Sequence, residues 1–191
     1  MNKKIDIKKM TYLAVLTAIV FLLQIISFFM RGPVFSLTFV LVPIVIGISL
    51  CGFSAGPWLG FVFGVAVLVT GDANAFLAVN PVASVVLVLL KGVAAGFAAA
   101  IVYKLLESKN RYLAVALAAI VAPIVNSGVF FVGCLLFFYD FISDLAALAG
   151  SSNVVLFILL TLIGINFIIE VVVNMILVPT IYRLINLKKK A

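Results

Sequence analysis

The sequence predicts an all-α membrane protein, a six-transmembrane-helix bundle with both termini cytoplasmic, and three observations carry this prediction. The 191 residues are 66% hydrophobic and only 10% charged, whereas soluble domains carry about 25% charged residues. The apolar runs divide into six segments of roughly membrane-spanning length. Lys and Arg gather in the segments that an even number of crossings places on one side. Because little chain remains for loops, we expect a single membrane domain over residues 1–191.

The apolar runs between breakers give the helices in order. The first run follows a basic N-terminus and lacks a clear small-residue cleavage site, so we expect a retained helix rather than a signal peptide. The stretch "CGFSAGPW" turns the second and third helices into a tight pair. The last run exceeds what a bilayer needs, which predicts tilt or protrusion. Between the last two helices, residues 139–153 are expected to form an exposed loop or a surface-lying turn. The six helices are expected near residues 10–30, 35–51, 54–71, 80–106, 112–139 and 153–184.

The basic residues predict the orientation. Eleven of the 13 Lys and Arg residues precede the first helix, separate the fourth from the fifth, or follow the sixth. Because cytoplasmic loops carry an excess of Lys and Arg, these segments and both termini are expected inside the cell. The opposite loops carry Asp72, Asp140 and Asp144, with Arg31 as their only cation. Topology therefore accounts for the net charge of +7, and no nucleic-acid partner is expected.

Glycines recur every fourth residue on two neighbouring predicted helices. Gly56, Gly60 and Gly64 lie on the third, and Gly92 and Gly96 lie on the fourth. Small residues at this spacing let helix backbones approach closely in lipid. We therefore expect these glycines to form packing seams within the bundle.

Nothing in the sequence predicts an enzyme, a metal site or a cofactor. The chain contains no histidine, which is the commonest general base and metal ligand. Cys51 and Cys134 lie in apolar runs and lack metal-ligand spacing, so we expect them to be packing residues rather than a disulfide. A Walker-type phosphate loop is also absent from the sequence.

Three predicted helices place polar side chains at similar depths. A charge at mid-membrane costs at least about 2.5–3.5 kcal/mol, so it is retained with a partner, a watery cavity or a function. With a rise of about 1.5 Å per residue, Lys91 lies roughly 16 Å from the outer end of its helix. Asn126 lies roughly 18 Å and Asn166 roughly 20 Å from the same side, with Glu170 one turn deeper. This coincidence predicts an internal polar pocket.

The stretch "INFIIEVVVNMI" on the sixth predicted helix spaces Asn166, Glu170 and Asn174 by four residues. That spacing stacks their side chains along one face, which we expect to form a wall of the pocket. A structural alternative remains open, in which Lys91 and Glu170 form an ion pair and the asparagines make interhelical hydrogen bonds. The two interpretations are compatible, because a ligand would exchange with that pair.

Several stretches together resemble a known family. The first helix, "TYLAVLTAIVF", spaces Ala14 and Ala18 by four residues, and the helical hairpin reads "PIVIGISLCGFSAGPWLGFVFG". The later helices carry "APIVNSGVFFVG" and "INFIIEVVVNMILVPTIYRLI". With its size and six predicted spans, the chain resembles the substrate-binding S component of energy-coupling factor (ECF) vitamin transporters. The resemblance covers nearly the whole chain and rests on a pattern more than on a sharp signature.

The resemblance implies a subunit that captures a small water-soluble vitamin or precursor from outside the cell and hydrolyses nothing itself. It also implies that Ala14 and Ala18 dock the first helix onto a separate membrane scaffold subunit, which two cytoplasmic ATPases drive. A pantothenate-like substrate is slightly favoured over a flavin, because no stacking aromatic residue can be placed around Lys91 from the sequence. The expected substrate-binding residues, assigned by location, are Lys91, Asn126, Asn166, Glu170, Asn174 and Arg31.

A stand-alone secondary transporter is the alternative. It would use Lys91 and Glu170 as an ion-coupled pair and would need no ATPase partner. The six short spans show neither an inverted repeat nor broken helices, which argues against this alternative.

Overall fold

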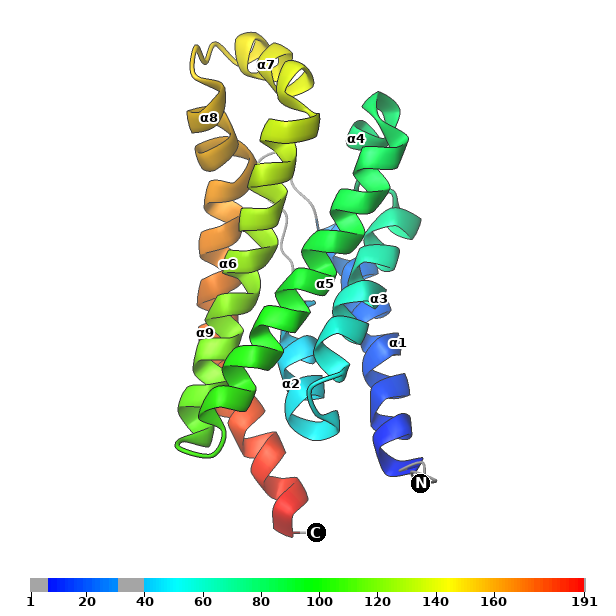
Figure 1. Ribbon diagram of the computed structural model, residues 1–191, viewed down its shortest axis with the longest axis vertical. Helices are drawn as coiled ribbons and strands as arrows, with labels where there is room; N and C mark the ends of the chain where they lie inside the picture. The colour runs from blue at the N-terminus through cyan, green and yellow to red at the C-terminus, as the bar shows by residue number, and fades with distance from the viewer. Residues whose placement is uncertain (1–6, 31–39, 191) are drawn as a thin grey trace.

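The computed structural model describes residues 7–30 and 40–190, and this part of the chain is helical without a β-strand. The helices run along one long axis and form a single bundle (Figure 1). Their bounds are α1 Ile7–Phe29, α2 Leu41–Cys51, α3 Ala55–Thr70, α4 Asn74–Val79, α5 Pro81–Leu106, α6 Arg111–Phe137, α7 Tyr139–Leu148, α8 Val154–Phe157, the π-helix η1 Ile158–Gly164, and α9 Ile165–Lys190.

The helices support a multi-pass membrane protein but do not confirm the predicted count of six spans. Four of them are long and apolar enough to cross a membrane, namely α1, α5, α6 and the continuous run Val154–Arg183 through α8, η1 and α9. The apolar helices α2 and α3 have only 11 and 16 residues. The predicted span 35–51 corresponds to α2, and its first residues, 35–39, lie outside the described part of the chain.

Asparagine side chains set where three of the later helices begin. Oδ1 of Asn80 accepts a hydrogen bond from the backbone N–H of Ala83 at 3.1 Å, and Pro81 occupies the first helical position of α5. Asn110 and Asn153 cap α6 and α8 in the same way. Such caps satisfy N–H groups that have no partner within the helix. They fix the starts of the helices that carry most of the predicted polar residues.

The glycine seam between α3 and α5 is confirmed. A Cβ added at Gly60 would meet the carbonyl oxygen of Gly92, and one added at Gly56 would meet that of Gly96. At Gly64 an added Cβ would lie 3.0 Å from the Cα of Leu89. The two helices are therefore in backbone contact, which only glycine permits at these positions.

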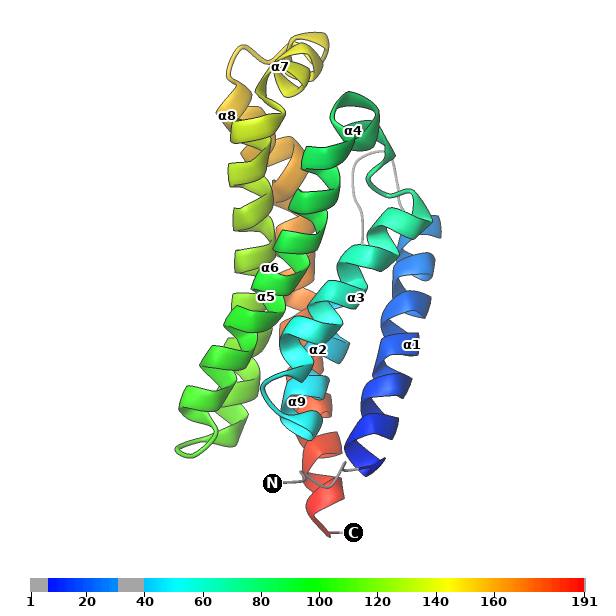
Figure 2. The same cartoon turned by 45° about the vertical axis from the view of Figure 1, so that its right-hand side comes forward.

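The start of α1, the end of α9 and the α5–α6 connection lie at one end of the bundle, whereas α4 and α7 form the other, here called the distal end (Figures 1 and 2). Lys8 and Lys9 open α1, and Lys104 and Lys109 flank the α5–α6 connection. Asp140 and Asp144 lie on α7 at the distal end. Glu107 lies beside Lys104 and Lys109, so the separation of basic from acidic residues is incomplete, and the predicted orientation in the membrane stays a prediction.

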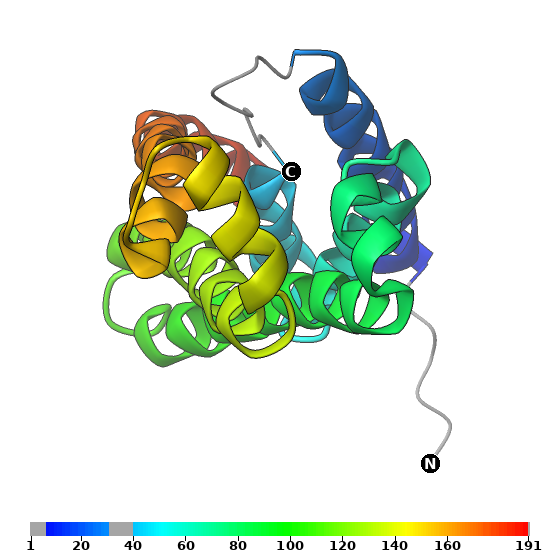
Figure 3. The same cartoon turned by 90° about the horizontal axis from the view of Figure 1, so that it is seen from above.

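The expectation of a loop or surface turn over residues 139–153 was wrong for most of that segment. Tyr139–Leu148 forms the helix α7, which lies across the distal end near α6 and α8 (Figure 3). Ile142 and Ala146 are four residues apart and fully buried, whereas Asp140 and Asp144 are exposed. This apolar stripe explains why the segment is helical despite its acidic residues.

Candidate substrate-binding site

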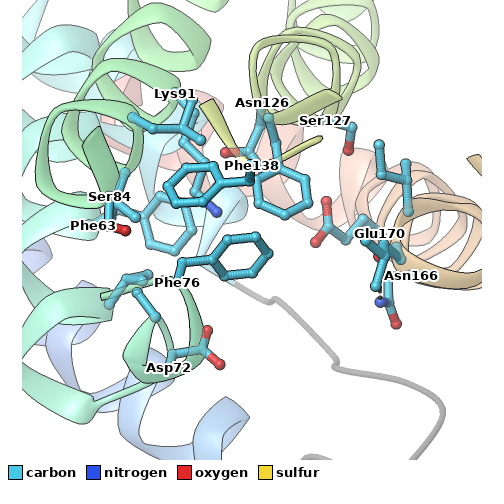
Figure 4. A pocket seen from close by; sticks show the side chains of 17 residues that line it. Phe63, Asp72, Phe76, Ser84, Lys91, Asn126, Ser127, Phe138, Asn166 and Glu170 are labelled. Carbon is cyan, nitrogen blue, oxygen red and sulfur yellow. Dashed lines mark hydrogen bonds between the residues drawn. The ribbon is translucent and has the colours of Figure 1, made fainter. Parts of the chain in front are cut away.

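A cavity of about 170 Å³ lies in the distal half of the bundle, between α3, α4, α5, α6 and the η1–α9 run (Figure 4). Its volume is more than ten times the roughly 10–15 Å³ that one water molecule requires, so a small organic molecule has room to bind. Aromatic side chains form much of the wall, from Phe63, Phe76, Phe130 and Phe138. The polar side chains on the wall are those of Asp72, Ser84, Lys91, Asn126, Ser127, Asn166 and Glu170.

Four of the sequence-predicted residues meet at this cavity. Lys91 comes from α5, Asn126 from α6, and Asn166 and Glu170 from α9. The convergence of three helices is therefore present in the structure, although contact of these residues with a substrate stays a prediction. Arg31, the remaining outer-loop candidate, lies outside the described residues.

Two aromatic rings lie close to the Lys91 ammonium, where none could be placed from the sequence. Nζ of Lys91 is 5.1 Å from the ring centroid of Phe130 and 6.0 Å from that of Phe63. Both distances suit cation–π attraction, which stabilises an ammonium group away from bulk water. One signal in the sequence does point to Phe130, because it follows Asn126 by four residues and thus shares its helix face.

Phe76 of α4 ties the aromatic wall together at the distal end of the cavity. Its ring meets those of Phe130, Phe138 and Phe141 edge-on, with centroids 5.5, 5.1 and 5.8 Å apart. Edge-to-face pairs of this kind add about 0.5–1.5 kcal/mol each beyond the burial of their surface. The short helix α4 is therefore anchored by one side chain that also faces the cavity.

Asn126 presents an unsatisfied acceptor at the cavity. Its side chain is buried, with 7% of its surface exposed, and Oδ1 has no hydrogen-bond partner in the described ranges 7–30 and 40–190. A buried polar atom without a partner costs about 1–3 kcal/mol. A donor supplied by a bound molecule would remove this cost.

Asn166 and Glu170 follow directly after a π-helical segment. The seven residues Ile158–Gly164 form η1, and Asn166 Nδ2 donates a hydrogen bond to the carbonyl oxygen of Leu162 at 3.3 Å. Glu170 is buried, with 6% of its surface exposed. π-Helical turns are rare and occur frequently at functional sites. The hydropathy of this run predicts a helix but carries no sign of the wider turn.

Asn174 does not share the wall expected for it. It is 1% exposed, and its Nδ2 donates a hydrogen bond to the carbonyl oxygen of Ala119 on α6 at 3.0 Å. Four residues exceed one α-helical turn by about 40°, so Asn174 is rotated by roughly 80° from Asn166. That drift directs the third member of the series toward α6 instead of the cavity wall.

Besides Ser84 and Ser127, the polar residues Asp72 and Gln24 of the site region were not among the sequence-predicted residues. Asp72 was placed in an outer loop, but it lines the cavity just after Gly71, which ends α3 with a φ of 80°. Gln24 of α1 is 2% exposed and donates a hydrogen bond from Nε2 to Asp72 Oδ2 at 3.3 Å. The two residues lie 48 positions apart, and no local pattern relates them.

The cavity and the bundle together fit the class of multi-pass membrane proteins that bind a small polar molecule. The family model described as "ECF transporter, substrate-specific component" matches residues 8–182. The chain belongs to this family and is a substrate-specific subunit of ECF transporters. Such subunits bind a small substrate, dock with a scaffold and ATPase module, and are not enzymes. Family membership does not favour a stand-alone secondary transporter. No curated protein and no solved structure matches the chain.

Proposed function

We propose that the chain captures a small water-soluble vitamin or vitamin precursor from outside the cell and holds it in the cavity. The observation that carries this proposal is the convergence of Lys91, Asn126, Asn166 and Glu170, from three helices, on one cavity. Intramembrane charges are costly and are retained for function or pairing. Here they lie in a space large enough for a ligand, within a protein of a substrate-binding family.

The residue types assign complementary roles in binding. Lys91 donates to a carboxylate, phosphate or carbonyl oxygen of the substrate, and Glu170 accepts from an amine or a hydroxyl group. Asn126 accepts through its buried Oδ1. Asn166 lies beside Glu170, on the part of the cavity wall that α9 forms (Figure 4). Arg31 remains a candidate contact from the outer loop.

The docking surface for the scaffold is assigned to α1. Ala14 and Ala18 are exposed and four residues apart, whereas Leu16 and Val20 on the same helix are buried. The small side chains leave room for a helix of the scaffold to approach the backbone of α1. In this arrangement the protein lies in the cell membrane with both termini on the cytoplasmic side, and two cytoplasmic ATPases drive the scaffold.

One reason for expecting a pantothenate-like substrate no longer applies. That expectation depended on the lack of any aromatic residue that could be placed around Lys91 from the sequence, and Phe63 and Phe130 lie close to its ammonium. A substrate with a flat ring therefore suits the cavity at least as well as an acyclic one.

Uptake in cells tests the function. The chain is expressed with the scaffold and both ATPases of an ECF transporter, and accumulation of radiolabelled vitamins is followed. We expect uptake to collapse when the Walker lysine of the ATPases is replaced. Full uptake by the chain alone, driven by an ion gradient, would contradict the proposal.

A further inference from the structure

The hydrogen bond from Gln24 to Asp72 connects the cavity to α1. Gln24 is almost fully buried, with 2% of its surface exposed, and a buried amide is costly unless it is hydrogen-bonded. Its Nε2 donates to Asp72 Oδ2 at 3.3 Å, while Asp72 forms part of the cavity wall. The arrangement therefore fixes a carboxylate at the cavity from a helix that does not itself line it.

The hydrogen bond from Gln24 restrains the orientation of the Asp72 carboxylate. An ionised carboxylate only accepts hydrogen bonds, and it has two oxygens with which to do so. With Oδ2 held by Gln24, the plane of the carboxylate is restrained, and the group faces the cavity in one orientation. A donor on a bound molecule then meets an acceptor whose position is already set, which lowers the ordering cost of binding.

The cavity wall combines two acidic groups, one basic group and several rings. Among the described lining residues, Asp72 and Glu170 are carboxylates and Lys91 is the single ammonium. In Figure 4 the two carboxylates lie on different sides of the Phe76 ring. A ligand that carried only negative charge would satisfy Lys91 but would approach two carboxylates without a donor for either.

We propose that Asp72 is a specificity-determining residue that contacts the substrate, that Gln24 is its positioning residue, and that the cavity selects a small nitrogen heterocycle bearing an amino group or a protonated ring nitrogen. The nitrogen donates to Asp72 or Glu170, the flat ring lies among the phenylalanines, and Lys91 meets an oxygen of the same molecule. This inference rests on the proposed function, since it takes the cavity as the substrate site.

Asp72, Lys91 and Glu170 each interact with other groups of the protein. A ligand nitrogen replaces a contact of a carboxylate, so binding exchanges one charge-assisted hydrogen bond for another. The selectivity comes from the ligands that cannot make this exchange. An acyclic carboxylate offers neither the ring nor the basic nitrogen.

Calorimetry on the purified full-length chain in lipid nanodiscs tests the substrate class. Thiamine and pyridoxamine are the nitrogen-bearing probes, pantothenate is the anionic probe without a ring, and riboflavin is the flat probe without a basic nitrogen. We expect thiamine or pyridoxamine to bind roughly tenfold or more tightly than pantothenate and riboflavin, because a charge-assisted hydrogen bond is gained. Tighter binding of pantothenate or riboflavin, or no binding of either amine, would overturn the substrate class.

A double-variant cycle tests the two residues with whichever amine binds more tightly. Asp72→Ala is expected to weaken binding roughly tenfold or more, and Gln24→Met by less. If Gln24 acts through Asp72, Gln24→Met causes no further loss in the Asp72→Ala background. An equal loss in both backgrounds would show a merely structural role for Gln24 and refute its role in positioning Asp72.

Asp140→Ala, which removes an exposed carboxylate of α7, is the matched control and should leave binding unchanged. Gln24→Asn, which retracts the amide, replaces Gln24→Met if the latter does not fold.

An error in the substrate class can be distinguished from an error in the proposed transport function. If the amines do not bind but the chain still forms a complex with the scaffold and supports ATP-dependent uptake, only the substrate class is wrong. If an amine binds but no complex with the scaffold and ATPases forms, the transport function is wrong while the site stands.

Discussion

Asn174 of α9 donates a hydrogen bond to the carbonyl oxygen of Ala119, the group that Pro123 leaves without a backbone partner in α6. A helical proline has no N–H, so the carbonyl four residues before it lacks its normal donor. The amide of Asn174 supplies that donor from the neighbouring helix at 3.0 Å. This hydrogen bond gives Asn174 a structural role.

Replacing Asn174 by leucine is expected to lower the free energy of unfolding by about 1 kcal/mol and to leave substrate affinity nearly unchanged. The variant leaves Ala119 without a donor in a buried position, and a lost hydrogen bond of this kind costs about that much. The measurement is the denaturation midpoint of the purified chain, compared in the wild-type and Pro123→Ala backgrounds. In Pro123→Ala the new N–H can serve Ala119, so the cost of Asn174→Leu should shrink. An equal cost in both backgrounds would contradict this pairing.

The seam of α3 and α5 gives a prediction with a built-in control. Gly60→Ala should destabilise the chain by about 1–3 kcal/mol, because the new methyl group meets the backbone of Gly92 and the helices must separate. Gly128→Ala should be neutral or slightly stabilising, since a Cβ there has no neighbour within 4 Å in the described structure and alanine favours the helix. Thermal unfolding of both variants in the same detergent makes the comparison. Similar shifts in the two would refute backbone contact at the seam.

Lys91 and Lys104 lie on the same helix, α5, and both approach a phenylalanine ring, yet only Lys91 lines the cavity. Lys91→Met should weaken binding of the transported vitamin by about 1–3 kcal/mol, because a charge-assisted contact is lost. Lys104→Met makes the same substitution at the opposite end of the bundle, so the affinity for the vitamin should not change. Equilibrium binding of the vitamin identified by the uptake experiment is the measurement. An unchanged dissociation constant for Lys91→Met would assign this lysine a structural role.

Hydropathy and spacing were sufficient to predict the parts of the fold that depend on single segments. The positions of Lys91 and Asn126 along their helices follow from counting residues from Asn80 and Phe138, which cap α5 and α6 in the structure. The glycine seam follows in the same way, because its spacing is a property of each helix alone. These features are encoded locally, so the sequence reveals them.

Features that depend on two segments meeting were missed. Asp72 has the ordinary sequence context of a loop carboxylate, and only the packing of α1 against α3 brings Gln24 to it. The ring of Phe76 reaches the cavity because α4 folds over the distal end. With six residues, α4 is too short for its sequence periodicity to reveal this position. Asn174 fits the spacing of Asn166, but its side chain bonds to Ala119 of α6 instead of lining the cavity. Tertiary contacts determine the positions of these side chains, and the pattern of a single sequence does not reveal those contacts.

The exposed alanines of α1 give the last prediction, which separates docking from substrate binding. Ala14→Trp or Ala18→Trp should abolish uptake while leaving the dissociation constant of the vitamin nearly unchanged, because a bulky ring keeps the scaffold helix from α1. The cavity would be unaffected, since both alanines are exposed and neither lines it. Val86→Trp on α5 is the matched control, because Val86 is 56% exposed on a spanning helix and should tolerate the ring. Co-purification with the scaffold, measured beside uptake, should be lost in the α1 variants and retained in Val86→Trp. Loss of vitamin binding together with uptake would show that the two surfaces are not separate.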